Sequence, residues 1–327
     1  MNQPFSVGEP LLRARDLQVK FGPLTAIQDV DFDLFAGETL GLVGESGSGK
    51  STLARAILRL VRACNGSVAW CGEDLLSCGP AVLRTLRRDL QIVFQDPLAS
   101  LDPRMTIGES IAEPLRIFEP GLNVQARRDR IGGMLERVGL GADMIGRYPH
   151  EFSGGQCQRI GIARAMILRP RLLVCDEPVG SLDVSIQGQI VNLLLDLQRD
   201  GGTAMLFISH NLAIVRHLSH RVLVMYCGRL VESAARDALF AGPIHPYTRA
   251  LLAAVPSGDA LLRSKLPTLP GAVEASSRAA ATGCSFRDRC PHAIAKCATA
   301  VPPLEEVTEG HAVACHRARE LNATRDD

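Results

Sequence analysis

The feature that most constrains the fold is a glycine-rich run that lies between an apolar segment and an amphipathic one. The run is Gly44-Glu45-Ser46-Gly47-Ser48-Gly49-Lys50-Ser51, which fits the pattern G-x-x-x-x-G-K-[S/T]. Residues 39–43 before it are typical of a short buried strand, and residues 51–60 after it have the apolar spacing of a helix. A strand, a glycine loop and a helix in this order predict an α/β fold with a phosphate-binding loop.

The residue types of this loop suit a phosphate chain. Glycines let main-chain N–H groups curve around an anion, and the N-terminus of the next helix adds partial positive charge. Lys50 would give a point charge to the β- and γ-phosphates, and Ser51 a hydroxyl to Mg²⁺. A chance match is disfavoured because lysine is rare in this chain. The nucleotide ligands predicted here are Gly44, Glu45, Ser46, Gly47, Ser48, Gly49, Lys50, Ser51 and Thr52.

Two carboxylates supply the second half of the predicted chemistry. Residues 172–175 are all apolar, as in a parallel strand buried on both faces, and Asp176 and Glu177 follow directly. Ligands of open α/β sheets bind at this carboxyl end of the strands. Asp176 would hold Mg²⁺ through water, and Glu177 would act as general base toward the attacking water. Alone, such a pair could equally be a solvated strand end; the phosphate loop favours the catalytic interpretation.

Further motifs lie between and after these two in a fixed order. They are Gln95 in Val93-Phe94-Gln95-Asp96-Pro97, the run Ser153-Gly154-Gly155-Gln156, and His210 after the apolar residues 205–208. With the phosphate loop and Asp176-Glu177, this order resembles that of the ATP-binding-cassette (ABC) ATPases over nearly all of residues 10–235. The resemblance implies that the chain binds and hydrolyses ATP as one half of a nucleotide-sandwich dimer.

The Ser153-Gly154-Gly155-Gln156 run resembles the family's signature motif, with Phe152 where leucine is usual. Ser153 is a good N-cap for a helix whose apolar face includes Ile160, Ala163 and Ile167. The resemblance implies that Ser153, Gly154, Gly155 and Gln156 contact the γ-phosphate of the partner cassette. The alternative is an ordinary helix cap, and the spacing before Asp176 favours the signature.

Four further roles are implied by the resemblance alone. Gln95 would sense Mg²⁺ and the attacking water, Asp183 would belong to the loop at the dimer interface, and His210 would contact the γ-phosphate. Phe21 is at the position of the aromatic residue that stacks on adenine, although a strand-end core residue is the alternative. The predicted catalytic residues are Glu177, His210 and Gln95, and the predicted Mg²⁺ ligands are Ser51, Gln95 and Asp176.

Composition narrows the class of ABC protein. The chain has 46% hydrophobic and 22% charged residues and a net charge of +1, which suits a globular protein and disfavours a nucleic-acid-binding one. The absence of an 18-residue apolar run predicts that it does not span a membrane, and the first residues lack a secretory pattern.

Four strings resemble the dipeptide/oligopeptide (peptide/nickel-type) importer branch: residues 96–106, 148–151, 183–187 and 245–252. The resemblance implies an ATPase that drives peptide import from the cytoplasmic face of a bacterial inner membrane. Its partners would be a second ATPase subunit, in a heterodimer with a paralogue, two membrane permease subunits, and a periplasmic or extracellular substrate-binding protein. The alternatives are import of nickel or another small solute, and a non-transport ABC ATPase that acts on nucleic acid.

Four cysteines in the tail, Cys284, Cys290, Cys297 and Cys315, follow a Pro/Ala/Ser-rich linker over residues 256–282. So short a region has little core of its own, and four thiols in it indicate a metal site rather than unrelated free thiols. Their spacing fits structural zinc knuckles poorly, and four cysteines also suit a [4Fe–4S] cluster. The resemblance to the peptide-importer tail implies the cluster, with Zn²⁺ as the alternative. Three nearby histidines, His292, His311 and His316, are expected to be solvated or to support the ligands, with His316 as an alternative ligand.

The predicted fold is an ABC-type P-loop NTPase. A RecA-like core with an antiparallel β edge would comprise residues 1–95 and 170–235, and a helical subdomain with the signature residues 96–169. A C-terminal extension over residues 236–327 would carry the metal-binding cysteines. In the implied cycle, ATP joins two cassettes, hydrolysis reopens them, and the helical subdomain passes this motion to the membrane subunits.

Overall fold

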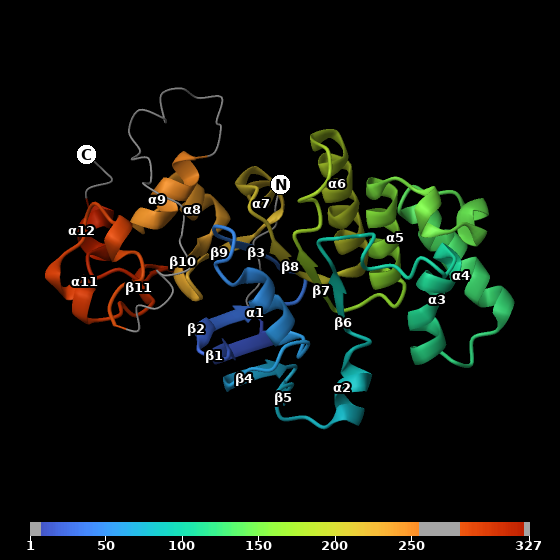
Figure 1. Ribbon diagram of the computed structural model, residues 1–327, viewed down its shortest axis with the longest axis horizontal. Coiled ribbons are helices and arrows are strands. Elements are labelled where there is room, and N and C mark those ends of the chain that lie inside the picture. The colour runs from blue at the N-terminus through green and yellow to red at the C-terminus, as the bar shows by residue number, and fades with distance from the viewer. Residues whose placement is uncertain (1–7, 255–281, 324–327) are drawn as a thin grey trace. The chain divides into compact units, whose positions relative to one another are not determined.

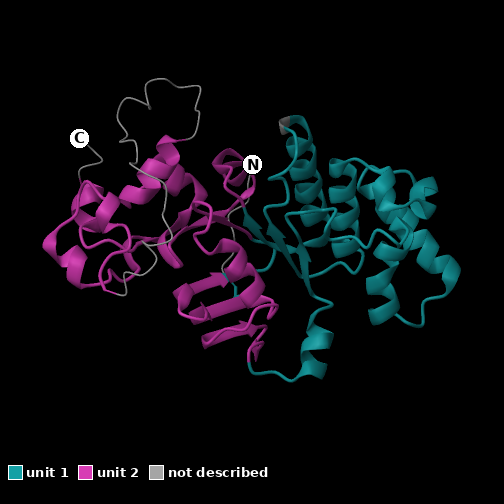
Figure 2. Cartoon of the chain, in the orientation of Figure 1, with its two compact units in different colours: residues 1–11, 34–38, 77–208 teal, residues 12–33, 39–76, 209–327 magenta. Residues whose placement is uncertain are grey.

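The computed structural model describes residues 8–254 and 282–323, and the chain divides into two compact units. Figure 2 colours unit 1 (residues 1–11, 34–38 and 77–208) and unit 2 (residues 12–33, 39–76 and 209–327) separately. Residues 256–281 of the predicted linker lie outside the described residues. Among the described residues, no helix combines the length and the apolarity that crossing a bilayer requires.

Unit 2 contains an antiparallel sheet in the order β2-β1-β4-β5 and a group of strands in the order β11-β12-β10-β9-β3 (Figure 1). Only β3 and β9 pair in parallel among the described strands of the second group. The bounds are β1 Leu12–Phe21, β2 Leu24–Leu34, β3 Thr39–Val43, β4 Asn65–Trp70, β5 Glu73–Asp74, β9 Arg221–Tyr226, β10 Arg229–Ala235, β11 Glu305–Thr308 and β12 His311–Val313. Alternate residues of β1 are buried, as expected for a sheet with one face on the core.

The helices of unit 2 follow its strands. They are α1 Lys50–Ile57, α7 Leu212–Leu218, α8 Arg236–Ala241, α9 Pro246–Ala253, the 3₁₀ turn η4 Arg287–Arg289, α11 Ala295–Thr299 and α12 Ala318–Ala323. The glycine loop leads from β3 into α1, which confirms the predicted order of strand, loop and helix. The helix ends at Ile57 instead of Leu60, because Arg59 takes up left-handed backbone angles (φ 52°).

Unit 1 is built on three parallel strands in the order β6-β7-β8, namely Leu90–Val93, Leu172–Asp176 and Ala204–Ile208. Every residue of β7 is buried, which confirms the predicted central strand. The helical elements are α2 Pro80–Leu86, α3 Ile107–Phe118, α4 Val124–Arg137, α5 Gly154–Met166 and α6 Val184–Gly201, with 3₁₀ turns η1 Ala142–Gly146 and η2 Pro149–Glu151.

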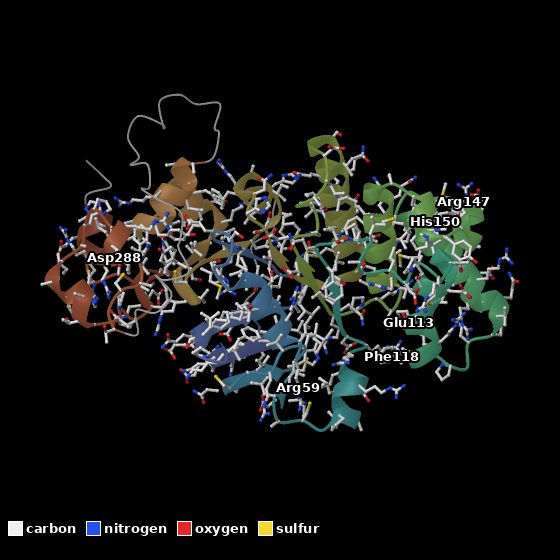
Figure 3. All side chains as sticks on the ribbon, viewed as in Figure 1. Arg59, Glu113, Phe118, Arg147, His150 and Asp288 are labelled. Atoms are coloured by element: carbon white, nitrogen blue, oxygen red, sulfur yellow. The ribbon has the colours of Figure 1, made fainter. Side chains whose placement is uncertain are left out.

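Helices α3 and α4 lie in the region after Gln95 where a helical subdomain is predicted. Thr106 and Glu109 make a reciprocal capping box at the start of α3, and the Asn123 side chain accepts from the Ala126 N–H at the start of α4. Figure 3 labels Glu113 and Phe118 on α3, with Arg147 beyond α4. The sequence therefore sets the start of each helix locally.

The tail does not stand as a separate module. Strand β12 pairs with β10, so the hairpin β11–β12 extends a sheet of unit 2. Val313, Ala318 and Leu321 form a small apolar core with Ile244, which precedes α9. The tail thus obtains its core from residues near position 240, which its own composition does not reveal.

One of the tail histidines differs from the prediction. His311 is buried (4% exposed), not solvated, and its Nε2 lies 2.7 Å from Oε1 of the fully buried Glu232. The expectation of solvation for His311 is wrong because β12 brings it against β10, where a buried carboxylate requires a partner. His316 Nε2 lies 2.9 Å from the Ala300 carbonyl oxygen.

His245 makes the stability of unit 2 depend on pH. Its Nδ1 accepts a hydrogen bond from the Tyr247 N–H (3.0 Å) and caps α9, so this nitrogen carries no proton in the folded state. Burial lowers the pKa of His245 to about 4, against the opposing charge of Glu232. Unfolded His245 takes up a proton at its ordinary pKa of 6.5, so stability is lost as the pH falls from 6.5 toward 4.

We expect His245→Asn to remove this dependence while keeping a cap acceptor. Between pH 7.5 and 5.0 the parent protein should lose about 2 kcal/mol of unfolding free energy more than the variant does. Denaturant titrations at both pH values measure this difference. The matched control is His217→Asn, since His217 is an exposed histidine on α7. Equal losses in the parent and His245→Asn would contradict the assignment.

Candidate active site

The phosphate loop between β3 and α1 depends on glycine at two points. Gly44 (φ 154°) and Gly49 (φ 107°) have backbone angles that favour glycine. A Cβ on Gly44 would lie 2.2 Å from the Met225 carbonyl oxygen, and one on Gly49 would lie 2.8 Å from that of Ala26. The loop is therefore held close to neighbouring main chain, with no room for larger residues.

Lys50 is folded into its own loop. Its Nζ donates to the carbonyl oxygens of Gly44 and Glu45 at 2.9 Å each, and the residue is 4% exposed. Ser51 follows in the first turn of α1, where main-chain N–H groups have no acceptor within the helix. The arrangement matches an anion site at a helix N-terminus, with the ammonium group close to the loop's main chain.

Two other predicted ligands of unit 2 are exposed. Phe21 ends β1 with 49% of its surface accessible, which is more than a core residue would show. His210 is exposed before α7, whose N-terminus is capped by the Asn211 side chain through the Ala213 N–H (3.1 Å). Both side chains are therefore accessible to a ligand.

Unit 1 brings the predicted base and the predicted sensor together. Asp176 is buried at the end of β7, and Glu177 directly after it has left-handed backbone angles (φ 48°). Gln95 Nε2 donates to Glu177 Oε2 at 3.3 Å across 82 positions of sequence. Such angles are uncommon for a non-glycine residue, and here they turn the chain directly after β7.

The signature run begins α5 as predicted. The Ser153 Oγ accepts from the Gln156 N–H (3.4 Å), and the Gln156 side chain accepts from the Ser153 N–H (2.9 Å). Gly155 has no room for a side chain, because a Cβ would lie 2.8 Å from the Ile186 Cγ2 of α6. Asp183 is exposed at the N-cap of α6. Ser153 and Asp183 are thus both at helix starts of unit 1.

The four tail cysteines lie close to one another. The Cys284 N–H donates to the Cys297 carbonyl oxygen at 2.7 Å. Burial raises the pKa of the Cys284 thiol to about 11, and the nearby thiols of Cys297, Cys290 and Cys315 add to the rise. In residues 8–254 and 282–323, no three His, Cys, Asp or Glu side chains stand where they could hold a metal ion together. Four thiols are suitable donors for a metal ion, but in this structure the cysteine side chains are not arranged around a common metal position.

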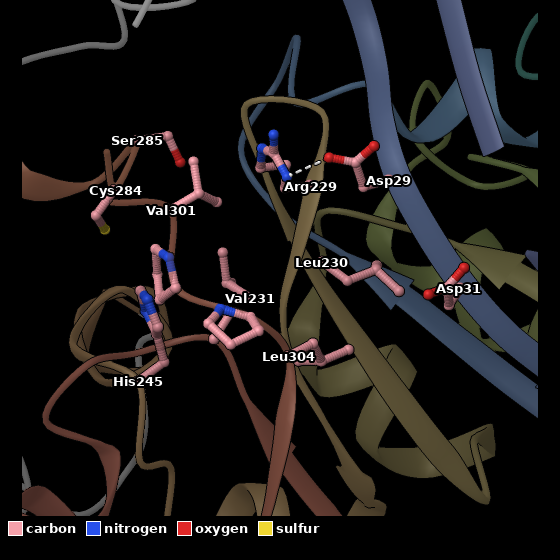
Figure 4. Close-up of a pocket in the computed structure, with 13 residues that line it drawn as sticks. Asp29, Asp31, Arg229, Leu230, Val231, His245, Cys284, Ser285, Val301 and Leu304 are labelled. Carbon is pink, nitrogen blue, oxygen red and sulfur yellow. Dashed lines mark hydrogen bonds and ion pairs between the residues drawn. The ribbon is translucent and has the colours of Figure 1, made fainter. Parts of the chain in front are cut away.

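A pocket of about 390 Å³ lies in unit 2 beside the tail (Figure 4). Its lining includes His245, Cys284 and the ion pair between Arg229 Nη1 and Asp29 Oδ2 (2.9 Å). Its lining shares no residue with the phosphate loop and does not include Phe21.

Comparison with known proteins identifies the family. A family model described as "ABC transporter" matches residues 27–180, and one described as "Oligopeptide/dipeptide transporter, C-terminal region" matches residues 231–297. The oligopeptide transport ATP-binding protein OppF of Salmonella typhimurium is 52% identical over 330 residues, covering 96% of this chain and 98% of that protein. The chain belongs to the oligopeptide transport ATP-binding proteins of the ABC transporter family.

Other relatives agree with this assignment. The OppF protein of Escherichia coli is 55% identical over 293 residues, with 89% of this chain and 87% of that protein covered. A dimeric post-hydrolysis structure of the ATP-binding cassette MJ0796, bound to ADP and Pi, matches with a TM-score of 0.63 at 27% identity. It covers 69% of this chain and 98% of that one. The chain is thus an ABC transporter ATPase with the α/β fold of ABC-type P-loop NTPases.

The sequence did not reveal three residues that surround Glu45 of the phosphate loop. They are Arg289 of η4, Tyr226 of β9 and Tyr247 of α9. Arg289 and Tyr247 each form a hydrogen bond with Glu45. The Tyr226 hydroxyl accepts from Arg289 Nη1 (3.4 Å). The string 245–252, which contains Tyr247, resembles the importer branch, but that resemblance does not indicate which loop Tyr247 contacts.

Proposed function

We propose that this chain is the ATP-hydrolysing subunit that powers the import of peptides through a membrane ABC transporter. The observation that carries the proposal is the similarity to OppF proteins along almost the whole chain, including the C-terminal region of oligopeptide/dipeptide transporters. The intact phosphate loop and the Gln95–Glu177 pair support ATP hydrolysis.

The proposed roles of the residues follow from their chemistry. Lys50 binds the β- and γ-phosphates, main-chain N–H groups of the phosphate loop other than that of Glu45 surround them, and Phe21 stacks on adenine. Ser51, Gln95 and Asp176 bind Mg²⁺ directly or through water, and Glu177 activates the attacking water. His210 contacts the γ-phosphate. Ser153 to Gln156 of this chain contact the γ-phosphate that a second cassette binds, with Asp183 at the interface.

The proposed partners follow from the transport role. The dimeric structure of MJ0796 supports pairing of two cassettes, which we propose to be this chain and a paralogue. The helical part of unit 1 would dock on two permease subunits at the cytoplasmic face of the inner membrane. Its exposed apolar side chains Leu98 (53%), Val124 (79%) and Tyr148 (41%) support a docking surface. Figure 3 labels His150, which stacks on Tyr148.

Purification of the chain together with the membrane proteins that bind it tests the transport role. The expected result is a complex with two multispanning permeases that hydrolyses ATP faster when peptide and a substrate-binding protein are added. Stimulation by nickel alone would support the other cargo, and salt-sensitive retention of DNA or RNA without permeases would support the nucleic-acid alternative. Either of these two results would contradict the proposal of peptide import.

We also propose that Cys284, Cys290, Cys297 and Cys315 hold a [4Fe–4S] cluster, with Zn²⁺ as the alternative. The proximity of the thiols supports this, although their side chains must move into ligating positions. Burial also raises the pKa of Cys290 and Cys315, so a metal must displace thiol protons and its affinity falls as the pH is lowered. The group would hold the tail together.

Serine at Cys290 is the sharpest test of this assignment. After anaerobic purification the parent protein should be brown with about four irons per chain, and Cys290→Ser should lose the visible absorption. The control is Cys64→Ser, since Cys64 is an exposed thiol far along the chain from the tail. One zinc and no colour would favour Zn²⁺, and a parent protein without either metal would remove the proposal.

A further inference from the structure

Glu45 of the phosphate loop forms an ion pair with Arg289 of the tail. Both guanidinium nitrogens Nη1 and Nη2 of Arg289 donate to the two Glu45 carboxylate oxygens at 2.9 Å, a bidentate pair across 244 positions of sequence. The two side chains are only 14% and 27% exposed. Such a pair fixes the direction of the carboxylate as well as its position.

The main chain of Glu45 is held at two further points. Its N–H donates to the Tyr247 hydroxyl at 2.8 Å, and its carbonyl oxygen accepts from Lys50 Nζ at 2.9 Å. Glu45 therefore contacts Lys50 through its carbonyl oxygen and Arg289 of the tail through its carboxylate. A displacement of the Glu45 side chain that shifts its main chain also moves the carbonyl oxygen that accepts from Lys50 Nζ.

A buried aromatic cluster packs against Arg289 and so restricts its position beside Glu45. Tyr226, Tyr247 and Phe286 are each at most 2% exposed, with ring centroids 4.6–5.6 Å apart. The Arg289 guanidinium lies 5.8 Å from the ring centroids of both Tyr226 and Phe286. Phe286 and Arg289 belong to the tail, whereas Tyr226 ends β9, so the cluster fastens the tail to the strand beside β3.

We propose that Arg289 is a positioning residue for ATP binding, through which the cysteine-bearing tail sets the phosphate loop's affinity for nucleotide. Arg289 directly precedes Cys290. A change in how well the tail is folded therefore acts on the phosphate loop through the Arg289 side chain. The arginine neutralises Glu45, whose carboxylate would otherwise repel the phosphates, and it holds the loop in one conformation before ATP arrives. The inference rests on the proposed role of the loop in binding ATP.

Kinetics and binding of Mg²⁺·ATP with the full-length chain test this inference. Arg289→Ala should raise the KM and the Kd for ATP about 10- to 30-fold and change kcat less than threefold, because Arg289 does not touch the reacting groups. Arg289→Lys should restore part of the loss, since lysine keeps the charge without the bidentate geometry. The matched control is Arg287→Ala, an arginine of the same turn that bonds the Thr282 carbonyl oxygen and should leave the KM unchanged.

A double-mutant cycle separates positioning from a general loss of structure. In an E45Q background the further effect of R289A on the KM should shrink to less than threefold, because the repelling carboxylate is gone. An undiminished effect in that background, or an unchanged KM in R289A alone, would overturn the inference. If the parent chain binds no ATP, or if K50A binds ATP as tightly as the parent does, the proposed function of the loop is wrong. This result differs from the two outcomes that would overturn only the role of Arg289.

Discussion

Replacing Glu177 by glutamine is expected to lower steady-state ATP hydrolysis roughly 10²- to 10⁴-fold, the usual contribution of a positioned general base. The amide has the size of the carboxylate but cannot take the proton of the attacking water. Gln95 Nε2, now 3.3 Å from Glu177 Oε2, can still donate to the amide oxygen, so the local geometry should survive. The loss should therefore appear in kcat, with little change in the affinity for ATP.

The same variant should also lengthen the life of the ATP-bound dimer. In the proposed cycle ATP joins two cassettes, and hydrolysis removes the γ-phosphate that both of them contact. Size-exclusion chromatography with Mg²⁺·ATP should show a dimer of the Glu177→Gln cassettes, with either the paralogue or a second copy. The parent protein should return to monomer as ATP is consumed.

A matched control separates the base from a general loss of charge. Glu136 is an exposed glutamate on α4, and Glu136→Gln should keep the parent rate. If Glu177→Gln retains more than a tenth of the parent activity, another group accepts the proton. His210→Ala would then show whether that group is the histidine before α7.

The elements around the active site could be predicted because their signals are local. The strand of residues 39–43, its glycine loop and the next helix depend on neighbours in sequence, as does the cap that Ser153 forms with Gln156. The left-handed backbone of Glu177 could not be predicted, since the chain around it imposes this conformation.

The tail shows why the remainder could not be predicted. The four cysteines of the tail predict a metal site, but the tail is joined to the rest of unit 2 by the pairing of β12 with β10. That pairing buries His311 against Glu232, and η4 carries Arg289 to Glu45 over 244 positions. Contacts at such separations leave no periodicity in the sequence, and a buried charged pair is chosen by tertiary packing rather than by the propensity of either residue.

Loss of the Glu232 carboxylate is expected to destabilise unit 2 by about 3–5 kcal/mol, because each buried polar group left without its partner costs roughly 1–3 kcal/mol. Glu232 is fully buried on β10. Its Oε1 accepts from the Ile244 N–H (2.7 Å) and lies 2.7 Å from His311 Nε2, while Oε2 accepts from the His245 N–H (3.1 Å). Glu232→Ala leaves all three groups buried without this acceptor.

Denaturant unfolding of Glu232→Ala measures this cost. Glu305→Ala is the matched control, since Glu305 is an exposed glutamate in strand β11 and its loss should change the unfolding free energy by less than about 0.5 kcal/mol. Glu232→Ala combined with His311→Ala should cost less than the sum of the single changes, because each single change leaves a buried polar partner. Equal stability of Glu232→Ala and Glu305→Ala would contradict the role of Glu232.

The effect of Glu232 should extend to the nucleotide. Glu232 holds the main chain just before α9, and α9 carries Tyr247, whose hydroxyl accepts from the Glu45 N–H in the phosphate loop. Under conditions in which Glu232→Ala is still folded, its KM for ATP should therefore be raised, as is also expected for Arg289→Ala. If Glu232→Ala binds ATP like the parent while its stability falls, the tail affects the loop through Arg289 alone and not through α9.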